Sequence, residues 1–438
     1  MNERRSPVTV AQASKQPKVL VIRGSISSKG GAERELIKSM IAWSNYMELR
    51  FASLDITSEI RSKLSGKIMC LQNPVSDEWP KGTISEITAA VSRFSEKAWL
   101  QIFEQNAEEN DSLANAIGWC DVIHISSGNG SLEILPIIPE NKPIHYHCLE
   151  PPRGLYENTL HLGLDGKKKR NLSLTKLVLS NQRRRHERLF NQLRTRKNVL
   201  ISGNSRYTQR RIEEIYGLEQ GVSLENGQPC QRNNDGTPIS STLLWHAIDL
   251  NEWAMPKNVE DKMEPYAITI GRACYAKGTL ESLESLQGTG LELTLVGSIS
   301  HDDRMMLAEV SKKNNVVLKI LSETTDEEIS DLISNATAVI SHAHGEPFGL
   351  TPLEAMACGT PALFVNDGGF RDTIVDDVNG RLLPRDDIDA WKNAIEQAKL
   401  LVNRKRWSEV GRERIEAMFT FEVQAKALLN LIEDLKSN

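Results

Sequence analysis

Residues 341–361, SHAHGEPFGLTPLEAMACGTP, constrain the fold of this chain more than any other stretch. The small apolar run 338–341 is typical of a strand, and a glycine-rich loop, 342–350, follows it. A helix start is predicted next, with Thr351 as N-cap, Pro352 at the first helical position and Glu354 three residues after the cap. Gly359 and Pro361 predict the end of this helix. Strand, loop, helix and a further strand at 362–365 predict an α/β fold.

The loop and the helix start predict an anion site, because free backbone N–H groups converge there. Glu346 and Glu354 add two carboxylates, eight positions apart. Phosphate at the helix start with carboxylates beside it favours a ligand that carries both phosphate and hydroxyl groups, such as a nucleotide sugar. Glu354 alone fits a capping box equally well, and Glu346 alone fits an exposed loop acid. Two acids framing the PFGL loop, 347–350, favour the ligand site.

Length and composition indicate a globular protein of two domains. The chain has 438 residues, and domains usually hold about 150–200. Its 39% hydrophobic and 25% charged residues exclude a disordered or fibrous class. The six cysteines form no CxxC pair, which is typical of reduced thiols in a cytosolic protein. The polar N-terminus lacks a signal-peptide core, and no run approaches the ~20 apolar residues of a membrane span. We therefore expect a cytoplasmic protein, able to lie peripherally on the inner face of a membrane.

The charge is distributed unevenly along the chain. Residues 153–211 hold 16 Lys or Arg against 3 acids, a net charge of +13, so the rest of the chain carries −18. Such a patch predicts an anionic partner for one face of one domain. A solvated charged face is the plain alternative. Nucleic acid is disfavoured because no binding motif or aromatic interleaving accompanies the charge. Anionic lipid headgroups or a lipid diphosphate fit a basic helix with nearby apolar side chains better.

Short apolar runs alternate with helical segments along both halves of the chain, which predicts two parallel sheets. Strands are expected at 18–22, 50–54, 67–71, 121–125, 143–147, 198–202 and 243–246, then at 266–270, 293–296, 316–321, 338–341, 362–365 and 381–383. The predicted organisation is a disordered tail at 1–16, a first domain at 17–250, a linker at 251–264, a second domain at 265–418 and a C-terminal helix at 419–438. A polar, turn-rich stretch, 217–242, predicts a long surface loop, and helices are expected at 391–402 and 422–435.

Three histidines end strands of the first half: His124, His145 and His147. A lone histidine is more often a hydrogen-bonded structural residue. Ligands gather at the carboxyl ends of parallel strands, however, which favours a functional role here. His145 and His147 share a strand face, so both side chains could reach a crevice at this edge.

Loops that follow strands supply the remaining candidates. Gly30 and Gly31 permit close backbone approach to a ligand, although neither GxGxxG nor a P-loop is present, so dinucleotide binding is not supported. Gly271, Arg272 and Lys277 stand at a strand–loop–helix junction. Arg as a fork and Lys as a point charge are suited to a diphosphate there.

The two halves resemble family-four retaining glycosyltransferases of GT-B fold (glycosyl transferases group 1), in their mannosyltransferase-like branch. The resemblance spans residues 18–435. It rests on GGAER at 30–34, EPPR at 150–153, NS at 204–205, GR at 271–272, KG at 277–278 and the E-x7-E motif within 345–359. It implies two Rossmann-like domains facing each other across a cleft, with the C-terminal helix packing back on the first. This sequence departs from the family at Leu149, at 245–253 and in the longer 217–242 insertion.

The resemblance also implies roles for individual residues. The catalytic group is Glu346, Arg272, Lys277 and His147. The donor-binding group is Gly30, Gly31, Gly271, Arg272, Lys277, Glu346, Pro347, Phe348, Gly349, Leu350, Thr351 and Glu354. In this group Glu354 holds the ribose, and Glu346 holds the transferred sugar or its phosphate. The acceptor side is His124, His145, His147, Glu150 and Arg153.

The expected activity is retaining transfer of a sugar, with mannose or a related hexose favoured, from a GDP- or UDP-linked donor. The acceptor would be a glycan, a lipid-linked sugar or another hydroxyl compound of polysaccharide or glycoconjugate biosynthesis. No cofactor and no metal are expected; Asp387 and Asp389 imitate a DxD motif but fit the acidic first turn of a helix. Two alternatives stay open: a nucleotide-sugar epimerase of the same fold, and a non-catalytic partner that binds a nucleotide sugar or an anionic surface.

Overall fold

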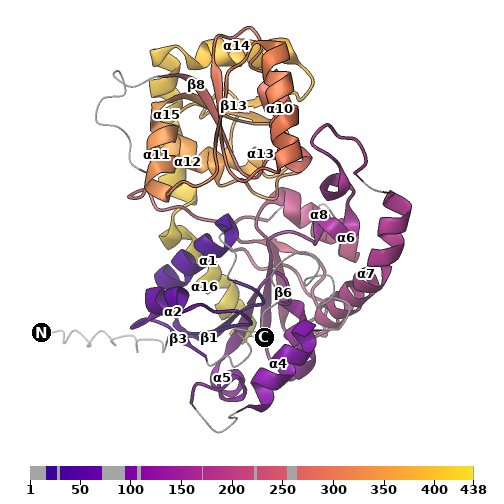
Figure 1. The fold of residues 1–438 in the computed structure, drawn as a ribbon. Helices are drawn as coiled ribbons and strands as arrows, with labels where there is room; N and C mark the ends of the chain where they lie inside the picture. The colour runs from indigo at the N-terminus through magenta and orange to yellow at the C-terminus, as the bar shows by residue number, and fades with distance from the viewer. Residues whose placement is uncertain are drawn as a thin grey trace, which may run out of the picture.

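Two parallel sheets, one from each half of the chain, form the framework of the protein (Figure 1). The computed structural model describes residues 16–26, 30–71, 94–105, 110–169, 171–220, 224–253 and 264–437. The predicted α/β architecture is confirmed. The predicted tail, 1–16, lies outside these residues except for Gln16, and residues 254–263 of the predicted linker lie outside them as well.

The first sheet has seven strands in the order β3-β2-β1-β4-β5-β6-β7, and every pair is parallel. Each overlaps a run predicted from its apolar residues, although β7 shares only Leu243 with the run predicted at 243–246. The strands are β1 (Lys18–Arg23), β2 (Glu48–Ser53), β3 (Met69–Cys70), β4 (Val122–Ser126), β5 (Ile144–Cys148), β6 (Val199–Gly203) and β7 (Thr242–Leu243).

The second sheet has six strands in the order β10-β9-β8-β11-β12-β13, again all parallel. In both sheets the strand order changes direction next to the first strand of that sheet. In doubly wound sheets of this kind, ligands bind in a crevice at this switch point. The switch points are β1/β4 and β8/β11. The strands are β8 (Glu264–Ile270), β9 (Glu292–Val296), β10 (Leu318–Leu321), β11 (Ala336–Ser341), β12 (Ala362–Val365) and β13 (Arg381–Leu383).

Helices connect these parallel strands. Those of the first half are α1 (Gly31–Trp43), α2 (Ser58–Leu64), α4 (Phe94–Glu104), α5 (Leu113–Trp119), η2 (Leu132–Ile137), α6 (Arg153–Tyr156), η3 (Thr159–His161), α7 (Leu172–Arg194) and α8 (Arg206–Tyr216). Those of the second half are η4 (Tyr275–Lys277), α9 (Thr279–Glu284), α10 (His301–Asn314), α11 (Asp326–Asn335), α12 (Thr351–Ala357), α13 (Phe370–Thr373), α14 (Ile388–Ala398), α15 (Leu401–Met418) and α16 (Phe421–Ser437).

The helix predicted at 391–402 is corrected by the structure. It is α14, which ends at Ala398, and α15 begins three residues later at Leu401. Asp387 is the N-cap of α14, where its carboxylate accepts a hydrogen bond from the Ala390 N–H at 2.9 Å. The apparent DxD motif is therefore explained by helix capping.

The C-terminal helix α16 packs back on the first domain, as predicted (Figure 1). It lies beside α1 and over one face of the first sheet, with a row of buried side chains: Ala425, Ala427, Leu428, Leu431, Ile432 and Leu435. These join the strand residues Val19 and Val21, whose neighbours Leu20 and Ile22 enter the core on the opposite face. Strand alternation thus divides the first domain into two core layers.

Residues of the 217–242 stretch pack against α16. A Cβ atom added at Gly227 would lie 2.5 Å from the Cα of Ala427. Arg232 pairs with Asp434 of α16, and Cys230 is buried in the same core layer. The predicted surface loop is therefore partly buried, because the helix that covers it arrives from the far end of the chain.

In the part of the chain that the structure describes, no helix is both long enough and apolar enough to cross a membrane.

Candidate active site

Two loops meet at the switch point of the second sheet, one after β8 and one after β11. Gly278, at the start of α9, brings them together: it adopts φ +61°, and an added Cβ would lie 2.1 Å from the His342 carbonyl oxygen. Only glycine allows this approach. The topology therefore places Lys277 of the first loop beside Glu346 of the second.

Lys277 and Glu346 form an ion pair at this edge of the sheet. The Lys277 Nζ atom donates to both Glu346 carboxylate oxygens, at 2.8 and 3.0 Å. Burial alone would lower the pKa of Lys277, but the Glu346 carboxylate outweighs it and the pKa is raised. The ammonium therefore stays charged in the neutral range and can face a phosphate.

Arg272 lies in the same segment after β8 as Lys277, and its side chain is exposed. It forms no hydrogen bond or ion pair with any residue that the structure describes. Gly271 precedes it at the end of β8, and an added Cβ there would lie 3.5 Å from the Lys277 side chain. The two predicted phosphate-binding cations thus border one site, and the guanidinium of Arg272 is available for a ligand.

The start of α12 differs from its prediction by one residue. The N-cap is Leu350, with no side-chain capping bond, so Thr351 is the first helical residue and Pro352 the second. This shift places Glu354 one position too far along the helix for a capping box. The capping alternative for Glu354 was wrong.

Glu354 is a half-buried acid near the loop, and no other side chain in the described segments bonds to it. Burial raises the pKa of its carboxyl group to about 7, although Arg34 lowers it and Asp326 raises it further. The carboxyl group is therefore available for a ligand hydroxyl group.

The GGAER loop of the first domain faces the donor-side loop of the second. A Cβ added at Gly31 would lie 3.6 Å from the Leu350 side chain. Arg34 pairs across the two domains with Asp326 at the start of α11. Gly30 is the N-cap of α1. The predicted glycines therefore lie where the two halves meet.

The EPPR motif also reaches the second domain. The Arg153 guanidinium donates to the His344 carbonyl oxygen at 2.7 Å and to Glu157 at 3.0 Å. Glu150 keeps contact with solvent, yet the surrounding protein raises the pKa of its carboxyl group to about 7. Arg153 lowers this pKa and Glu346 raises it. Glu150 and Arg153 thus lie next to the Lys277–Glu346 pair.

The three predicted acceptor-side histidines lie inside the first domain. His124 Nδ1 is 3.0 Å from His145 Nδ1, and His145 Nε2 is 2.8 Å from Ser202 Oγ. His147 Nε2 donates to the Leu244 carbonyl oxygen at 2.9 Å. All three are buried, and burial lowers their pKa values. Their contacts are those of core residues, so roles at the acceptor, including the catalytic role of His147, have no support from their placement.

Sequence reasoning missed the residues that join the first domain to the PFGL loop. The hydroxyl groups of Ser205 and Thr208 donate to the Pro347 carbonyl oxygen. The His246 ring lies 5.3 Å from that of Phe348 and also pairs with Glu35 at 3.0 Å. The NS motif at 204–205 was a signal for the first contact. No pattern in the sequence predicts the position of His246 at this contact.

A second missed residue, Arg385, holds the loop after β11. Its guanidinium donates to the carbonyl oxygens of His342 and Ala343 and to Asp367, the last at 3.0 Å. Asp367 in turn accepts from the Gly345 N–H at 3.1 Å. The loop that carries Glu346 is thus fixed on both sides.

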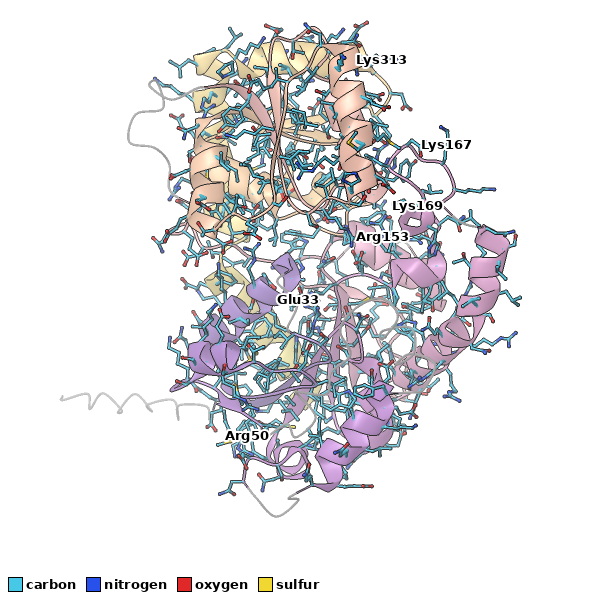
Figure 2. The ribbon with its side chains drawn as sticks, in the orientation of Figure 1. Glu33, Arg50, Arg153, Lys167, Lys169 and Lys313 are labelled. Carbon is cyan, nitrogen blue, oxygen red and sulfur yellow. The ribbon has the colours of Figure 1, made fainter. Side chains whose placement is uncertain are left out.

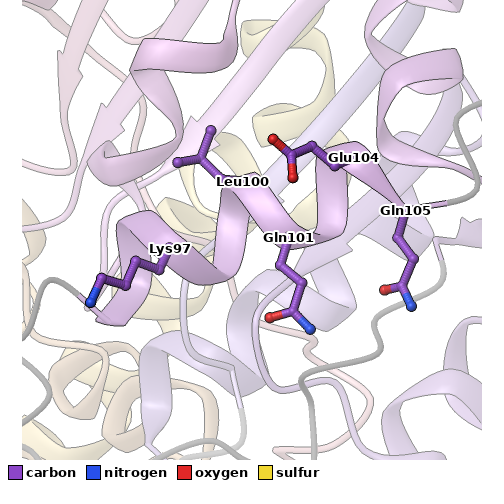
Figure 3. Close-up of a pocket in the computed structure, with 5 residues that line it drawn as sticks. All are labelled: Lys97, Leu100, Gln101, Glu104 and Gln105. Atoms are coloured by element: carbon purple, nitrogen blue, oxygen red, sulfur yellow. The ribbon is translucent and has the colours of Figure 1, made fainter.

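A shallow hollow on α4 lies apart from these residues (Figure 3). It measures about 480 Å³ and is lined by Lys97, Leu100, Gln101, Glu104 and Gln105. Four of these side chains come from α4 and the fifth from Gln105 directly after it, at the end of the first domain away from the second (Figure 1). The hollow does not belong to the site.

Comparison with known proteins finds a family that resembles part of the second half. Residues 252–414 match the model of the glycosyl transferases group 1 family. This part of the chain is similar to members of that family. The two-sheet architecture is the GT-B fold: the chain matches sucrose-phosphate synthase from Thermosynechococcus elongatus (TM-score 0.65, 16% identity) and the Anabaena protein HepE in complex with UDP-glucose (TM-score 0.61, 16% identity). Each match covers 97% of this chain and 100% of the other.

Curated relatives are similar over a shorter length. An alpha-maltose-1-phosphate synthase from Mycobacterium tuberculosis is 25% identical over 50% of this chain and 56% of its own. The alpha-1,3/1,6-mannosyltransferase ALG2 from Dictyostelium discoideum is 25% identical over 51% of this chain and 53% of its own. The chain thus spans about half the length of these two relatives.

Proposed function

We propose that the protein is a glycosyltransferase that moves a sugar from a nucleotide-sugar donor to a hydroxyl acceptor. The observation that carries this proposal is the Lys277–Glu346 ion pair at the β8/β11 switch point, inside the segment that matches the family. Ligands of doubly wound sheets bind at this position. The structural neighbour that holds UDP-glucose supports the donor class.

The cations of the site bind the diphosphate of the donor, and the acids bind its sugars. Arg272 and Lys277 bind the diphosphate, with backbone N–H groups near Gly349. Glu354 binds the ribose and Glu346 the transferred sugar. GDP- or UDP-linked mannose or a related hexose is the favoured donor, since a mannosyltransferase is among the similar proteins. The acceptor is a glycan, a lipid-linked sugar or another hydroxyl compound used to build polysaccharides or glycoconjugates.

The proposed reaction retains the configuration of the anomeric carbon and requires no metal or other cofactor. The acceptor oxygen attacks from the face of the leaving group and forms the new bond to the anomeric carbon. The bond from that carbon to the donor phosphate breaks, and the phosphate oxygen takes the acceptor proton. Negative charge grows on the diphosphate, so Lys277 and Arg272 stabilise the transition state more than the ground state. A cytoplasmic location is part of this proposal.

A thermal-shift panel of GDP-, UDP- and dTDP-sugars tests the proposal. One donor class should raise the melting temperature, because a ligand at 100 times its Kd stabilises a protein by about 2.7 kcal/mol. Lys277→Ala should weaken that donor about 10- to 100-fold, since hydrogen bonds to charged groups contribute about 1.5–3 kcal/mol. Lys312→Ala, an exposed change on α10, is the matched control.

Transfer itself is tested with Glu346→Ala, which should abolish product formation with the identified donor. Normal turnover by Glu346→Ala, or no stabilisation of the wild type by any donor, would contradict the proposal. Conversion of the donor in the absence of an acceptor would indicate the epimerase instead.

A further inference from the structure

The basic segment 153–211 is divided by the structure into two parts. Several of its arginines serve the fold: Arg185 pairs with Glu96 at 2.9 Å, Arg206 with Asp372 at 3.2 Å and Arg211 with Glu157 at 3.0 Å. Arg196 is buried beneath η2, where it donates to backbone carbonyl oxygens. Most of the described cations that remain exposed lie between residues 167 and 188; Lys197 and Arg210 are exposed outside that range.

The outer half of α7 presents aliphatic side chains to solvent. Leu174, Leu177 and Val178 are 59%, 69% and 63% exposed. Their spacing of three and four residues places them on one stripe of the helix, which continues to Arg184 and Arg188. Both arginines are exposed and have no bonding partner among the residues that the structure describes. Figure 1 shows α7 along the outer edge of the first domain.

A lysine-bearing hairpin leads into this helix. Leu162 and Lys168 form an antiparallel bridge, and the Gly163 N–H donates to the Lys167 carbonyl oxygen at 2.7 Å. Lys167 and Lys168 are exposed, and Figure 2 shows Lys167 pointing away from the protein. From 162 to 188 the chain has nine Lys or Arg and two acids; Asp165 pairs with Lys167 at 2.9 Å and Glu187 with Arg183 at 2.8 Å. We call the hairpin 162–168 and the outer half of α7, 172–188, the basic edge.

We infer that the basic edge docks on an anionic lipid bilayer. Exposed aliphatic side chains can enter the region between headgroups and acyl chains, while lysines and arginines along the same edge meet anionic headgroups. A nucleic acid would gain nothing from three exposed aliphatic side chains. A stable protein interface is usually enriched in aromatic residues at its centre, whereas this stripe has none. The combination of charge and aliphatic exposure favours lipid.

The same hairpin contacts the second domain. Leu164 is buried in the core of that domain. A Cβ added at Gly166 would lie 3.0 Å from the Tyr275 ring, and Lys169 Nζ lies 3.9 Å from an Asp303 carboxylate oxygen. Tyr275 stacks on His344, with ring centroids 4.2 Å apart, beside the donor-side loop. Docking would thus bring the meeting point of the two domains to the bilayer; that an acceptor is used there rests on the proposed function.

Vesicle co-sedimentation of the full chain tests this inference. The wild type should sediment with phosphatidylcholine vesicles that contain phosphatidylglycerol and stay in solution with phosphatidylcholine alone. Leu174→Ser/Leu177→Ser and Lys167→Glu/Lys168→Glu should each lower the apparent affinity at least about tenfold, since each basic residue near the surface adds appreciably to binding. All four positions are exposed, so both variants should keep the wild-type melting temperature.

Two matched controls separate docking from general effects. Leu400→Ser/Val402→Ser removes equally exposed aliphatic side chains from the second domain, at 53% and 70% exposure. Lys312→Glu/Lys313→Glu reverses two exposed charges on α10. Both should sediment as the wild type does.

Several results would overturn the inference: no wild-type binding to anionic vesicles, undiminished binding by the basic-edge variants, or equal losses in the controls. Donor binding in the thermal-shift panel uses no lipid. A protein that binds a donor but no vesicle therefore refutes the docking alone, whereas one that binds vesicles but no donor refutes only the proposed function.

Discussion

Two acids near the donor-side loop, Glu150 and Glu354, are protonated over an unusual pH range. The pKa of each is raised to about 7, for Glu354 by burial and for the solvent-exposed Glu150 by the partial desolvation that the surrounding protein imposes. The folded state therefore binds more protons than the unfolded state between about pH 4.5, the ordinary value, and pH 7. Stability contributed by these groups falls as the pH rises through that window. Above pH 7 the folded protein bears the full free-energy cost of ionising these carboxyl groups. Below their ordinary pKa of 4.5 it bears none of this cost.

Glu354→Gln removes the free-energy cost of ionising the Glu354 carboxyl group in the folded protein. We expect the variant to be more stable than the wild type at pH 8, by about 1–3 kcal/mol, because an uncharged amide replaces a poorly solvated carboxylate. At pH 4.5 the difference should largely disappear. Urea unfolding at the two pH values measures it, with the exposed Glu309→Gln as control. An equal difference at both pH values would contradict the explanation.

Burial also explains which site residues could be predicted at this scale. Lys277 and Glu346 lie in the segments that follow β8 and β11, and they come together because these strands are neighbours in the sheet. Alternating strands and helices predict the parallel sheet but not this order. His145 and His147 share a strand face, as period-two alternation requires. What covers that face is α16, some 270 positions further along the chain. No local pattern carries that information, so the burial of the histidines could not be foreseen.

At the scale of elements, the strands were predicted most accurately. A short apolar run bounded by loops in an α/β chain is seldom anything other than a buried strand. Helix limits were less accurate: α14 and α15 divide at Lys399 and Leu400, where no glycine or proline marks the break. The amphipathic pattern predicted α16 as a helix, whereas only the resemblance predicted its return to the first domain. Its buried row makes it part of that domain.

Leu428→Ala tests this assignment. Leu428 is fully buried between α16 and the first sheet, and removing a buried leucine side chain costs about 2–5 kcal/mol. Amide hydrogen exchange should accelerate in β1 and β2 while protection in β9 and β11 persists. Leu400→Ala, at an exposed position, should change neither. Equal loosening of both sheets would show that α16 stabilises the molecule as a whole.

At the scale of the whole molecule, polar contacts fix the two domains to each other. The Arg206 N–H donates to Asp372 at 2.6 Å, and its guanidinium pairs with the same carboxylate at 3.2 Å. Arg153 and the hydroxyl groups of Ser205 and Thr208 reach the donor-side loop from the first domain. Sequence could assign these residues to motifs but not to an interface, since their partners lie at least 139 positions away along the chain.

Asp372→Asn should loosen this contact. Asp372 is buried, and losing the charge weakens both of its bonds to Arg206, at a cost of about 1–3 kcal/mol. Thermal unfolding should separate into two transitions, because the domains then unfold less cooperatively. Calorimetry measures this, with the exposed Asp302→Asn on α10 as control. A single transition shifted in both proteins alike would contradict the role of Asp372.

The return of α16 has a consequence for biosynthesis. The second domain is continuous from β8 to α15, but the first domain needs its last core layer from residues 421–437. During translation α16 cannot cover its share of this core layer, next to β1, β2 and α1, until it has itself left the ribosome. An early stop codon would spare the donor-side fold and expose the other domain to chaperones and proteases. Loss of α16 would therefore be detected as exposed apolar surface on the first domain, not on the second domain that precedes α16 in the chain.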